Sequence, residues 1–312
     1  MRAFITGASG QDSFYLSALL AEKGYEVYGL IRRSAQPKVI PANIKVVAGD
    51  VTDSGISDMI AELKPDEIYN LAAMSHVGES FKIPRSTFAV NAMGVINLLE
   101  GARKTGARFY QASTSELFGV SPSPQDESTA FHPRSPYGVA KLAAYWSAVN
   151  YREAYGLFAC NGILFNHESP YRGEDFVTQK ICRGVARIEH GDKTPIRLGN
   201  LEARRDWGHA KDYVRGMWQM LQHEKPDDYV LATGETHSIR EFLNTAFGYV
   251  GIEDWTPYVV VDESFKRPAE IPELCGNPRK AETLLGWRRC YSFQNIVYEM
   301  MEHALIKEYS AA

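Results

Sequence analysis

A tyrosine and a lysine stand four residues apart in the segment YGVAK, at Tyr137 and Lys141. The surrounding run, Pro136–Tyr155, has apolar residues at helical spacing, so both side chains are expected on one face of a helix. An ammonium beside a phenol, together with the positive charge of an oxidised cofactor, would stabilise the phenolate and lower the phenol's pKa from about 10. Such a phenolate can take the proton of a hydroxyl while hydride leaves for a cofactor. The alternative is a solvent-exposed pair without a catalytic role.

A second polar cluster, Ser113-Thr114-Ser115-Glu116, directly follows a strand-like run at Arg108–Gln111. Ligands bind beyond the carboxyl ends of the strands in open α/β sheets, so this cluster is expected to face the same site as the tyrosine. A carboxylate in a half-buried cleft can serve as both base and acid, which makes Glu116 a candidate catalytic residue. The competing interpretations are a surface ion pair for Glu116 and a strand-end cap for Thr114.

A glycine turn, Gly7-Ala8-Ser9-Gly10-Gln11-Asp12-Ser13, joins a strand at Arg2–Thr6 to a helix at Asp12–Lys23. Glycines allow a tight turn and let backbone N–H groups approach a pyrophosphate at the helix N-terminus. The spacing is G-x-x-G-x-x-S and lacks a third glycine, so an ordinary β-turn-α unit remains an alternative.

Later loops match the path of a dinucleotide. Arg32 and Arg33 follow the second strand where an acidic residue would bind a ribose 2′-hydroxyl, and arginine fits a 2′-phosphate, which indicates NADP. A solvated basic loop is the alternative there. Asp50 and Val51 follow the third strand beside the expected adenine, and small residues Leu71-Ala72-Ala73 follow the fourth.

Strands and helices alternate through the first half of the chain. Strands are predicted at Arg2–Thr6, Glu26–Ile31, Lys45–Ala48, Glu67–Leu71, Arg108–Gln111 and Phe158–Leu164, and helices at Asp12–Lys23, Ser54–Leu63, Pro84–Lys104 and Pro136–Tyr155. The fold class is therefore α/β: a Rossmann-type doubly wound parallel sheet with a smaller α/β C-terminal substrate lobe. We place a nucleotide-binding domain at residues 1–165 and the substrate lobe at 166–312, with interleaving or one interleaved domain left open. In the lobe, helices are predicted near Val177–His190, His209–His223, Ser238–Val250 and Phe293–Glu308.

Composition excludes several classes of protein. The 312 residues are 45% hydrophobic and 23% charged, which is ordinary for a globular protein, and the net charge of −4 predicts no nucleic-acid or membrane partner. No apolar run approaches the ~18 residues of a membrane span. The four cysteines are far apart without a CxxC motif, so neither a metal site nor a disulfide framework is predicted, and a cytoplasmic location is expected.

Longer segments carry a family resemblance. TGASGQDS, NLAAMSHVG, FYQASTSELFG, PRSPYGVAKLAAYW, NGILFNHESPYRG, LGNLEARRDWGHAKDYV and FKRPAEI resemble the GDP-mannose 4,6-dehydratases, which are extended short-chain dehydrogenases/reductases. The resemblance implies a tightly held NADP that is recycled in each turnover, a GDP-sugar substrate, and a homodimer or homotetramer. The cofactor residues it implies, with those above, are Gly7, Ser9, Gly10, Gln11, Asp12, Arg32, Arg33, Asp50, Val51, Leu71, Ala72, Ala73, Ser75, Tyr137, Lys141, Leu164, Asn166, His167 and Arg172.

The family catalyses a redox-neutral hydro-lyase reaction. The resemblance implies the same reaction for this chain, with roles for the following residues. Tyr137, assisted by Lys141, would deprotonate the C4 hydroxyl as hydride passes to NADP, and Thr114 would hydrogen-bond the C4 oxygen. Glu116 would then take the C5 proton and assist loss of the C6 hydroxyl, and hydride would return to C6. The substrate residues that the resemblance implies are Ser75, Ser115, Asn166, Lys180, Arg205, Arg267 and Glu270. Glu270 would bind either guanine or ribose.

Three positions depart from the family pattern: Ser13 replaces a glycine, Met74 a glutamine and Gln179 an arginine. The departures leave open a related dehydratase or epimerase acting on another nucleotide sugar, such as a GDP-heptose. A cofactor-sensing protein without catalysis would be expected to lose the Tyr137 and Lys141 pair, which this chain keeps.

Overall fold

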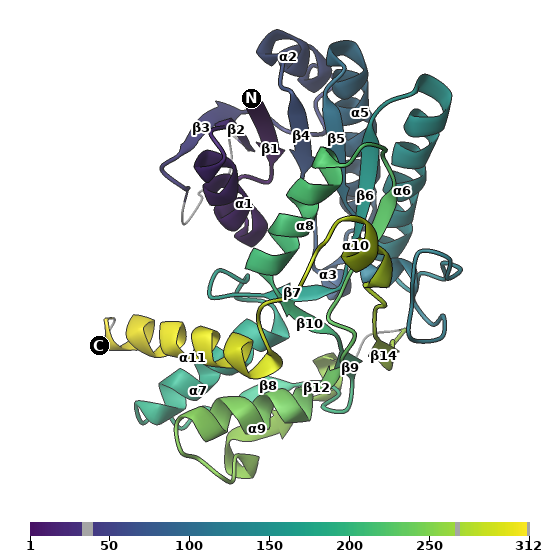
Figure 1. Ribbon diagram of the computed structural model, residues 1–312. Coiled ribbons are helices and arrows are strands. Elements are labelled where there is room, and N and C mark those ends of the chain that lie inside the picture. Colours follow the sequence, from purple (N-terminus) through teal and green to yellow (C-terminus); the bar gives the residue numbers. More distant parts are fainter. Residues whose placement is uncertain (33–39, 266–268, 311–312) are drawn as a thin grey trace.

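A seven-stranded parallel sheet forms the centre of the protein in a computed structural model that describes residues 1–32, 40–265 and 269–310 (Figure 1). The strand order is β11-β6-β5-β4-β1-β2-β3. The bounds are β1 (Arg2–Thr6), β2 (Glu26–Ile31), β3 (Ile44–Ala48), β4 (Glu67–Asn70), β5 (Arg108–Ala112), β6 (Ala159–Leu164) and β11 (Asp228–Leu231). The predicted doubly wound α/β fold is confirmed, and the six predicted strands agree with the observed bounds to within a residue.

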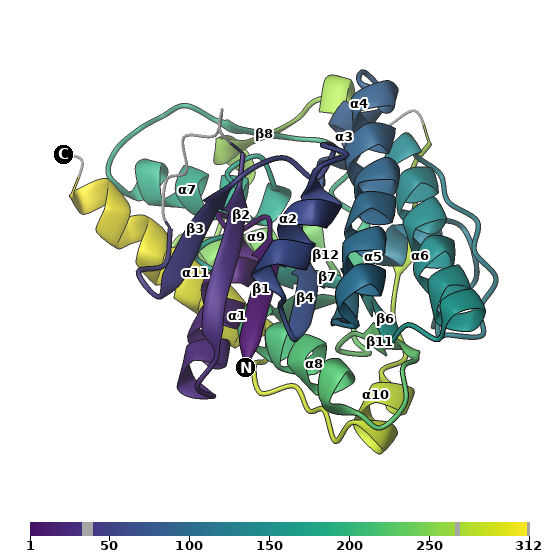
Figure 2. The same cartoon turned by 90° about the horizontal axis from the view of Figure 1, so that it is seen from above.

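Helices cover both faces of this sheet (Figure 2). On one face, α1 (Gln11–Glu22) and α8 (Ala210–Gln222) share a buried apolar core with the strands. On the other face, α2 (Ile56–Leu63), α5 (Gly94–Thr105) and α6 (Pro136–Tyr155) enclose a second core. With both faces covered, the strand ends are left as the place where polar groups can meet a ligand.

The predicted helix Pro84–Lys104 is continuous but not regular. It runs through α4 (Pro84–Phe88), a π-helical turn at Ala89–Met93, and α5. Asn91, in the π turn, is buried and grips the backbone of Met74 after β4: it accepts from the Met74 N–H at 2.8 Å and donates to its carbonyl at 3.1 Å. Single π turns inside α-helices are frequent at functional sites, and this one holds a loop beside the predicted site.

The second half of the chain forms a smaller helical layer below the sheet in Figure 1. Helices α7 (Val177–Glu189), α9 (Ile239–Tyr249) and α11 (Phe293–Tyr309) share one apolar core. Short strands pair beside them: β7 (Asn166–Glu168) with β10 (Trp207–His209), β8 (Ile196–Leu198) with β13 (Val259–Val261), and β9 (Arg204–Arg205) with β12 (His237–Ser238) and β14 (Glu273–Leu274). The remaining turns of helix are α3 (Val77–Ser80), α10 (Arg279–Leu284) and 3₁₀ turns at Ser115–Leu117, Thr256–Tyr258 and Glu263–Phe265.

The chain crosses between the two parts more than once. After entering the lower layer it returns through α8 to β11, which pairs with β6 at the sheet edge. Asp228, at the start of β11, is fixed there by the Arg152 guanidinium at 2.8 Å and by the Tyr145 hydroxyl at 2.9 Å. Burial raises the pKa of Asp228, but Arg152 outweighs it and holds that pKa below its usual range. The division near residue 165 stays a prediction.

No helix among the residues that the structure describes is both long and apolar enough to cross a membrane.

Candidate active site

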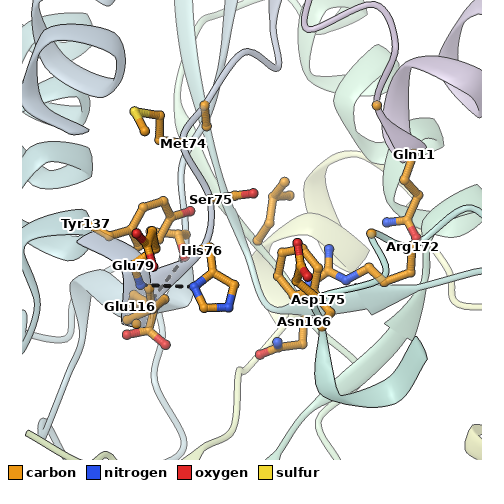
Figure 3. Close-up of a pocket in the computed structure, with 18 of the residues that line it drawn as sticks. Gln11, Met74, Ser75, His76, Glu79, Glu116, Tyr137, Asn166, Arg172 and Asp175 are labelled. Atoms are coloured by element: carbon orange, nitrogen blue, oxygen red, sulfur yellow. Dashed lines mark hydrogen bonds between the residues drawn. The ribbon is translucent and has the colours of Figure 1, made fainter. Parts of the chain in front are cut away.

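One cavity of about 1100 Å³ lies between the carboxyl edge of the sheet and the lower layer (Figure 3). Every predicted site residue within the described ranges lines it. They are Gly7, Ser9, Gly10, Gln11, Asp12, Arg32, Asp50, Val51, Leu71, Ala72, Ala73, Ser75, Thr114, Ser115, Glu116, Tyr137, Lys141, Leu164, Asn166, His167, Arg172, Lys180, Arg205 and Glu270. The predictions for Arg33 and Arg267 fall outside the described residues. The roles of all these residues stay predictions.

The glycine turn fits the diphosphate of a dinucleotide. Gly7 has φ +68°, and a Cβ placed on it would lie 2.9 Å from the backbone nitrogen of Ala72, so only glycine fits this close approach of two strand ends. Gly10 is the residue before α1, and because it has no side chain it does not cap the first N–H groups of that helix. Those groups are therefore available to an anion at the positive end of the helix.

Ser13 occupies the position of the missing third glycine without disrupting the turn. Its side chain is fully buried, and its hydroxyl has no hydrogen-bond partner among the residues described. The other departures differ in position. Met74 lines the cavity. The side chain of Gln179, in contrast, is buried in α7 and does not face the cavity in this structure.

Tyr137 stands in the first turn of α6, where the chain enters from β5 through a long loop. Ser135 caps this helix by accepting from the Gly138 N–H at 3.0 Å, and the Tyr137 N–H donates to the Ser80 hydroxyl at 3.2 Å. Pro136 at the first helical position needs no N–H partner. These contacts fix the backbone of Tyr137 while its side chain lines the cavity.

Lys141 lies one turn further, with its Nζ 6.0 Å from the Tyr137 ring centre, and donates to the Ala112 carbonyl at 2.8 Å. Burial lowers the pKa of Lys141 to about 8, so the ammonium form still prevails at neutral pH. The lowered pKa expected for Tyr137 in the presence of an oxidised cofactor stays a prediction, because the protein's own groups act in the opposite direction. Burial raises the pKa of Tyr137 to about 12, and a hydrogen bond with Thr114 offsets only part of the increase.

Thr114 and Glu116 sit where β5 ends. The Thr114 hydroxyl accepts from the Glu116 N–H at 3.2 Å and caps the short 3₁₀ turn Ser115–Leu117. Both side chains are buried, with 8% of each exposed, at the wall of the cavity. Figure 3 shows Glu116 and Tyr137 on the same side of the cavity, and the Glu116 charge contributes to the raised pKa of Tyr137. A carboxylate, a phenol and a hydroxyl therefore converge on one small volume.

An ionic contact joins the glycine turn to the opposite wall. His167 Nε2 lies 3.0 Å from the Asp12 carboxylate, and Gln11 donates to the His167 carbonyl at 3.0 Å. Burial lowers the pKa of His167, but the Asp12 charge outweighs it and raises that pKa overall. In return, burial raises the pKa of Asp12 and His167 more than reverses that increase. The pair anchors β7 to the start of α1.

The second wall is rich in cations. Arg172 pairs with the buried Glu168 at 3.1 Å and lies over the Phe176 ring at 3.7 Å. Lys180 lies over the Phe265 ring at 3.9 Å, and Arg205 donates to the Arg204 carbonyl at 2.8 Å. Cations at this density suit a diphosphate, which pairs readily with guanidinium and ammonium groups.

Sequence reasoning missed several residues that line the cavity: His76, Glu79, Lys82, Asp175, Phe176, Arg197 and Trp207. His76 belongs to the quoted segment NLAAMSHVG, which signalled the family without assigning this residue a role. The others lie in loops or in elements of only three or four residues, such as α3, β8 and β10, which are too short for periodicity to indicate which side chain faces inward. Only the folded arrangement of α3, β8, β10 and the loop before α7 brings them to the cavity.

Fold and cavity together define a short-chain dehydrogenase/reductase of the extended type. A family model for GDP-mannose 4,6 dehydratase matches residues 4–300. GDP-mannose 4,6 dehydratase 1 of Arabidopsis thaliana is 50% identical over 97% of this chain and 89% of its own length. The human GDP-mannose 4,6 dehydratase is 48% identical over 96% of this chain and 90% of its length.

The chain belongs to the GDP-mannose 4,6-dehydratase family, a family of enzymes, which confirms the resemblance drawn from its motifs. Among solved structures, UDP-glucose 4-epimerase of Thermus thermophilus in complex with NAD has a TM-score of 0.87 at 26% identity, over 97% of this chain and 99% of that one. RMD of Pseudomonas aeruginosa complexed with NADPH has a TM-score of 0.81 at 24% identity, over 98% and 99%. The latter likeness concerns the fold alone.

Proposed function

We propose that the protein is a hydro-lyase that converts GDP-mannose to GDP-4-keto-6-deoxy-mannose with a nicotinamide cofactor, specifically NADP. The observation that carries this proposal is the convergence of Thr114, Glu116, Tyr137 and Lys141 on the cavity that also holds the glycine turn. A plain epimerase or dehydrogenase has no need of a buried carboxylate beside the tyrosine. Glu116 therefore favours water elimination over both.

Bound NADP supplies the oxidation of the sugar at C4 and its later reduction at C6. The chain's own residues move the protons. Tyr137 would take the proton of the C4 hydroxyl as a phenolate while Thr114 holds the C4 oxygen. The Lys141 ammonium and the positive charge of an oxidised nicotinamide would together have to lower the pKa of Tyr137 for this step. The resulting 4-keto group acidifies C5, so Glu116 can remove the C5 proton and deliver it to the C6 hydroxyl, which leaves as water. Hydride return to C6 would leave C5 to be protonated by Glu116 with a proton regained from solvent, while Tyr137 would release its proton to solvent, so the sequence is redox-neutral and both residues are restored.

The protein should purify with NADP(H) partly bound, because a cofactor that is regenerated in each turnover gains nothing by leaving. Arg32 lines the cavity after β2, where it can pair with a 2′-phosphate. Denaturing the purified protein and identifying the released nucleotide by mass tests this assignment. Recovery of NAD alone would contradict it, and Arg32→Ala should lower NADP affinity while leaving NAD affinity unchanged.

GDP-mannose should be converted, and UDP-glucose should not. Lys180 and Arg205 can bind any diphosphate, so the choice of base must come from an acceptor or from pocket shape. Glu270 lines the cavity and is the acceptor that we propose for the guanine N1–H and 2-amino groups. Losing it leaves donors unpaired at about 1–3 kcal/mol each, so Glu270→Ala should lower kcat/KM for GDP-mannose roughly 10- to 100-fold.

Steady-state assays of the parent and Glu270→Ala with GDP-mannose, UDP-glucose and an ADP-sugar check this prediction. If Glu270 binds ribose, the variant should lose affinity for GDP and ADP alike. If the parent eliminates water from a GDP-heptose and not from GDP-mannose, the related-dehydratase alternative replaces the main proposal.

A homodimer or homotetramer is part of the proposal. Large apolar side chains are exposed on the packed group formed by α4, the π turn and α6: Phe88 is 37% exposed, Met93 60%, Val139 43% and Trp146 55%. Apolar exposure on this scale supports self-association.

The free cysteines of the chain support the proposed cytoplasmic location, where thiols stay reduced. We also propose that the chain consists of a nucleotide-binding domain, residues 1–165, and a substrate lobe, residues 166–312.

A further inference from the structure

The segment from Met74 to the end of α3 is held at both ends. At one end, Asn91 grips both backbone polar groups of Met74. At the other end, the Ser80 hydroxyl accepts from the Tyr137 N–H at 3.2 Å and donates to the Val77 carbonyl at 2.6 Å. A side chain between these two anchors is therefore carried by a backbone that is fixed relative to Tyr137. His76 is that side chain, and it lines the cavity.

One ring nitrogen of His76 is already used. Its Nδ1 accepts from the Glu79 N–H at 3.0 Å and so caps α3. A neutral imidazole carries one proton, and a nitrogen that accepts a hydrogen bond cannot hold it. The cap thus assigns the proton to Nε2, which leaves His76 with a single fixed N–H donor and no remaining acceptor.

The Nε2–H group of His76 belongs to a side chain that lines the cavity. Figure 3 shows the imidazole between Glu116 and Asn166, on the cavity side of the loop that also carries Ser75. Across from it stands Phe176 of the lower layer, with ring centres 6.3 Å apart and with the Arg172 guanidinium 3.7 Å from the phenyl ring. His76 therefore lies at the border between the proton-transfer groups and the cationic wall.

We propose that His76 binds the hexose of the substrate by donating from Nε2–H to one of its oxygens, an inference that rests on the proposed function. A neutral donor is matched to a hydroxyl or carbonyl oxygen, whereas the diphosphate is matched to the cations of the second wall. The Ser80 hydroxyl links the backbone next to His76 to the backbone of Tyr137. A hexose bound by His76 would therefore be held at a fixed position relative to Tyr137, which takes its C4 proton.

Two variants separate this role from helix capping. Asparagine places its side-chain oxygen near the position of Nδ1, so His76→Asn keeps the cap and loses the Nε2 donor. Glutamine places its amide nitrogen near Nε2, so His76→Gln keeps a donor and loses the cap. We expect His76→Asn to lower kcat/KM for GDP-mannose roughly 3- to 10-fold, and His76→Gln to retain more activity than His76→Asn.

Binding measurements give the second readout. GDP lacks the hexose, so its Kd should be the same for the parent and for His76→Asn, while the Kd of GDP-mannose should rise in the variant. Equal loss of affinity for GDP and GDP-mannose would place His76 on the nucleotide and overturn the proposal. Parent-like activity in His76→Asn together with impairment in His76→Gln would leave His76 as a helix cap only and would also overturn it.

Failure of the proposed function has a different signature. A parent protein that neither binds nor dehydrates GDP-mannose would overturn both the function and the hexose contact. A parent that dehydrates GDP-mannose and is matched by His76→Asn in kcat/KM and in both Kd values would overturn the hexose contact alone. Thermal unfolding of each variant, with and without NADP+, reports whether the fold and the cofactor site are intact.

Discussion

Replacing Tyr137 with phenylalanine should prevent any reduced cofactor from forming when enzyme, NADP+ and GDP-mannose are mixed. The substitution removes the hydroxyl that takes the C4 proton and leaves the buried ring in place. A positioned acid–base group contributes about 10²–10⁴-fold, so turnover should fall by at least that factor. Absorbance of reduced nicotinamide, followed in a stopped-flow instrument, measures the first step directly.

Tyr110→Phe is the matched control for this variant. Tyr110 is also fully buried, and its hydroxyl has no partner among the described residues. Unlike Tyr137, Tyr110 does not line the cavity. Turnover by Tyr137→Phe within about tenfold of the parent would assign proton removal to another group.

Replacing Glu116 with glutamine should stop the reaction one step later. The first oxidation needs only Tyr137, so reduced cofactor should appear and then accumulate, because glutamine cannot take the C5 proton. Product formation should fall by about 10²–10⁴-fold. Exchange of the C5 hydrogen with deuterium from the solvent should also be lost, and mass spectrometry of recovered GDP-sugar detects this.

The contrast between two carboxylates makes the test specific. Glu79 lines the same cavity and pairs with Lys82 at 3.1 Å at its edge. Glu79→Gln removes a charge of the same sign, yet it should not cause reduced cofactor to accumulate. If Glu116→Gln yields no reduced cofactor at all, Glu116 acts before or during the first oxidation and the order of steps proposed here is wrong.

Much of the fold was predictable because most strands of the parallel sheet are buried and contain apolar runs bounded by turn residues. The helix Pro136–Tyr155 was predicted with both ends correct, since Pro136 marks its start and Gly156 its end. The return of β11 to the sheet was not predicted. Its four residues carry no length or spacing signal, and their place depends on contacts such as Arg152 with Asp228, which lie 76 positions apart.

The candidate site was predictable in its residues and less so in its electrostatics. Spacing placed Tyr137 and Lys141 on one helical face, but it carried no information about burial, and burial is what raises the pKa of Tyr137 to about 12. His76 was missed for a related reason. Its tautomer follows from a backbone N–H three residues later, and that contact exists only once α3 has formed.

Removing the π turn at Ala89–Met93 would make this helix regular, but it would also disturb the candidate active site. A π turn amounts to one residue inserted into an α-helix, and deleting one residue would restore regular geometry. Each residue turns an α-helix by about 100°, so the deletion would swing Asn91 relative to everything on the other side of it. The hydrogen bonds of Asn91 to Met74 and the packing of α5 against α2 cannot both survive such a rotation. Selection for thermal stability, which favours regular helices, is thus expected to leave this irregular turn in place.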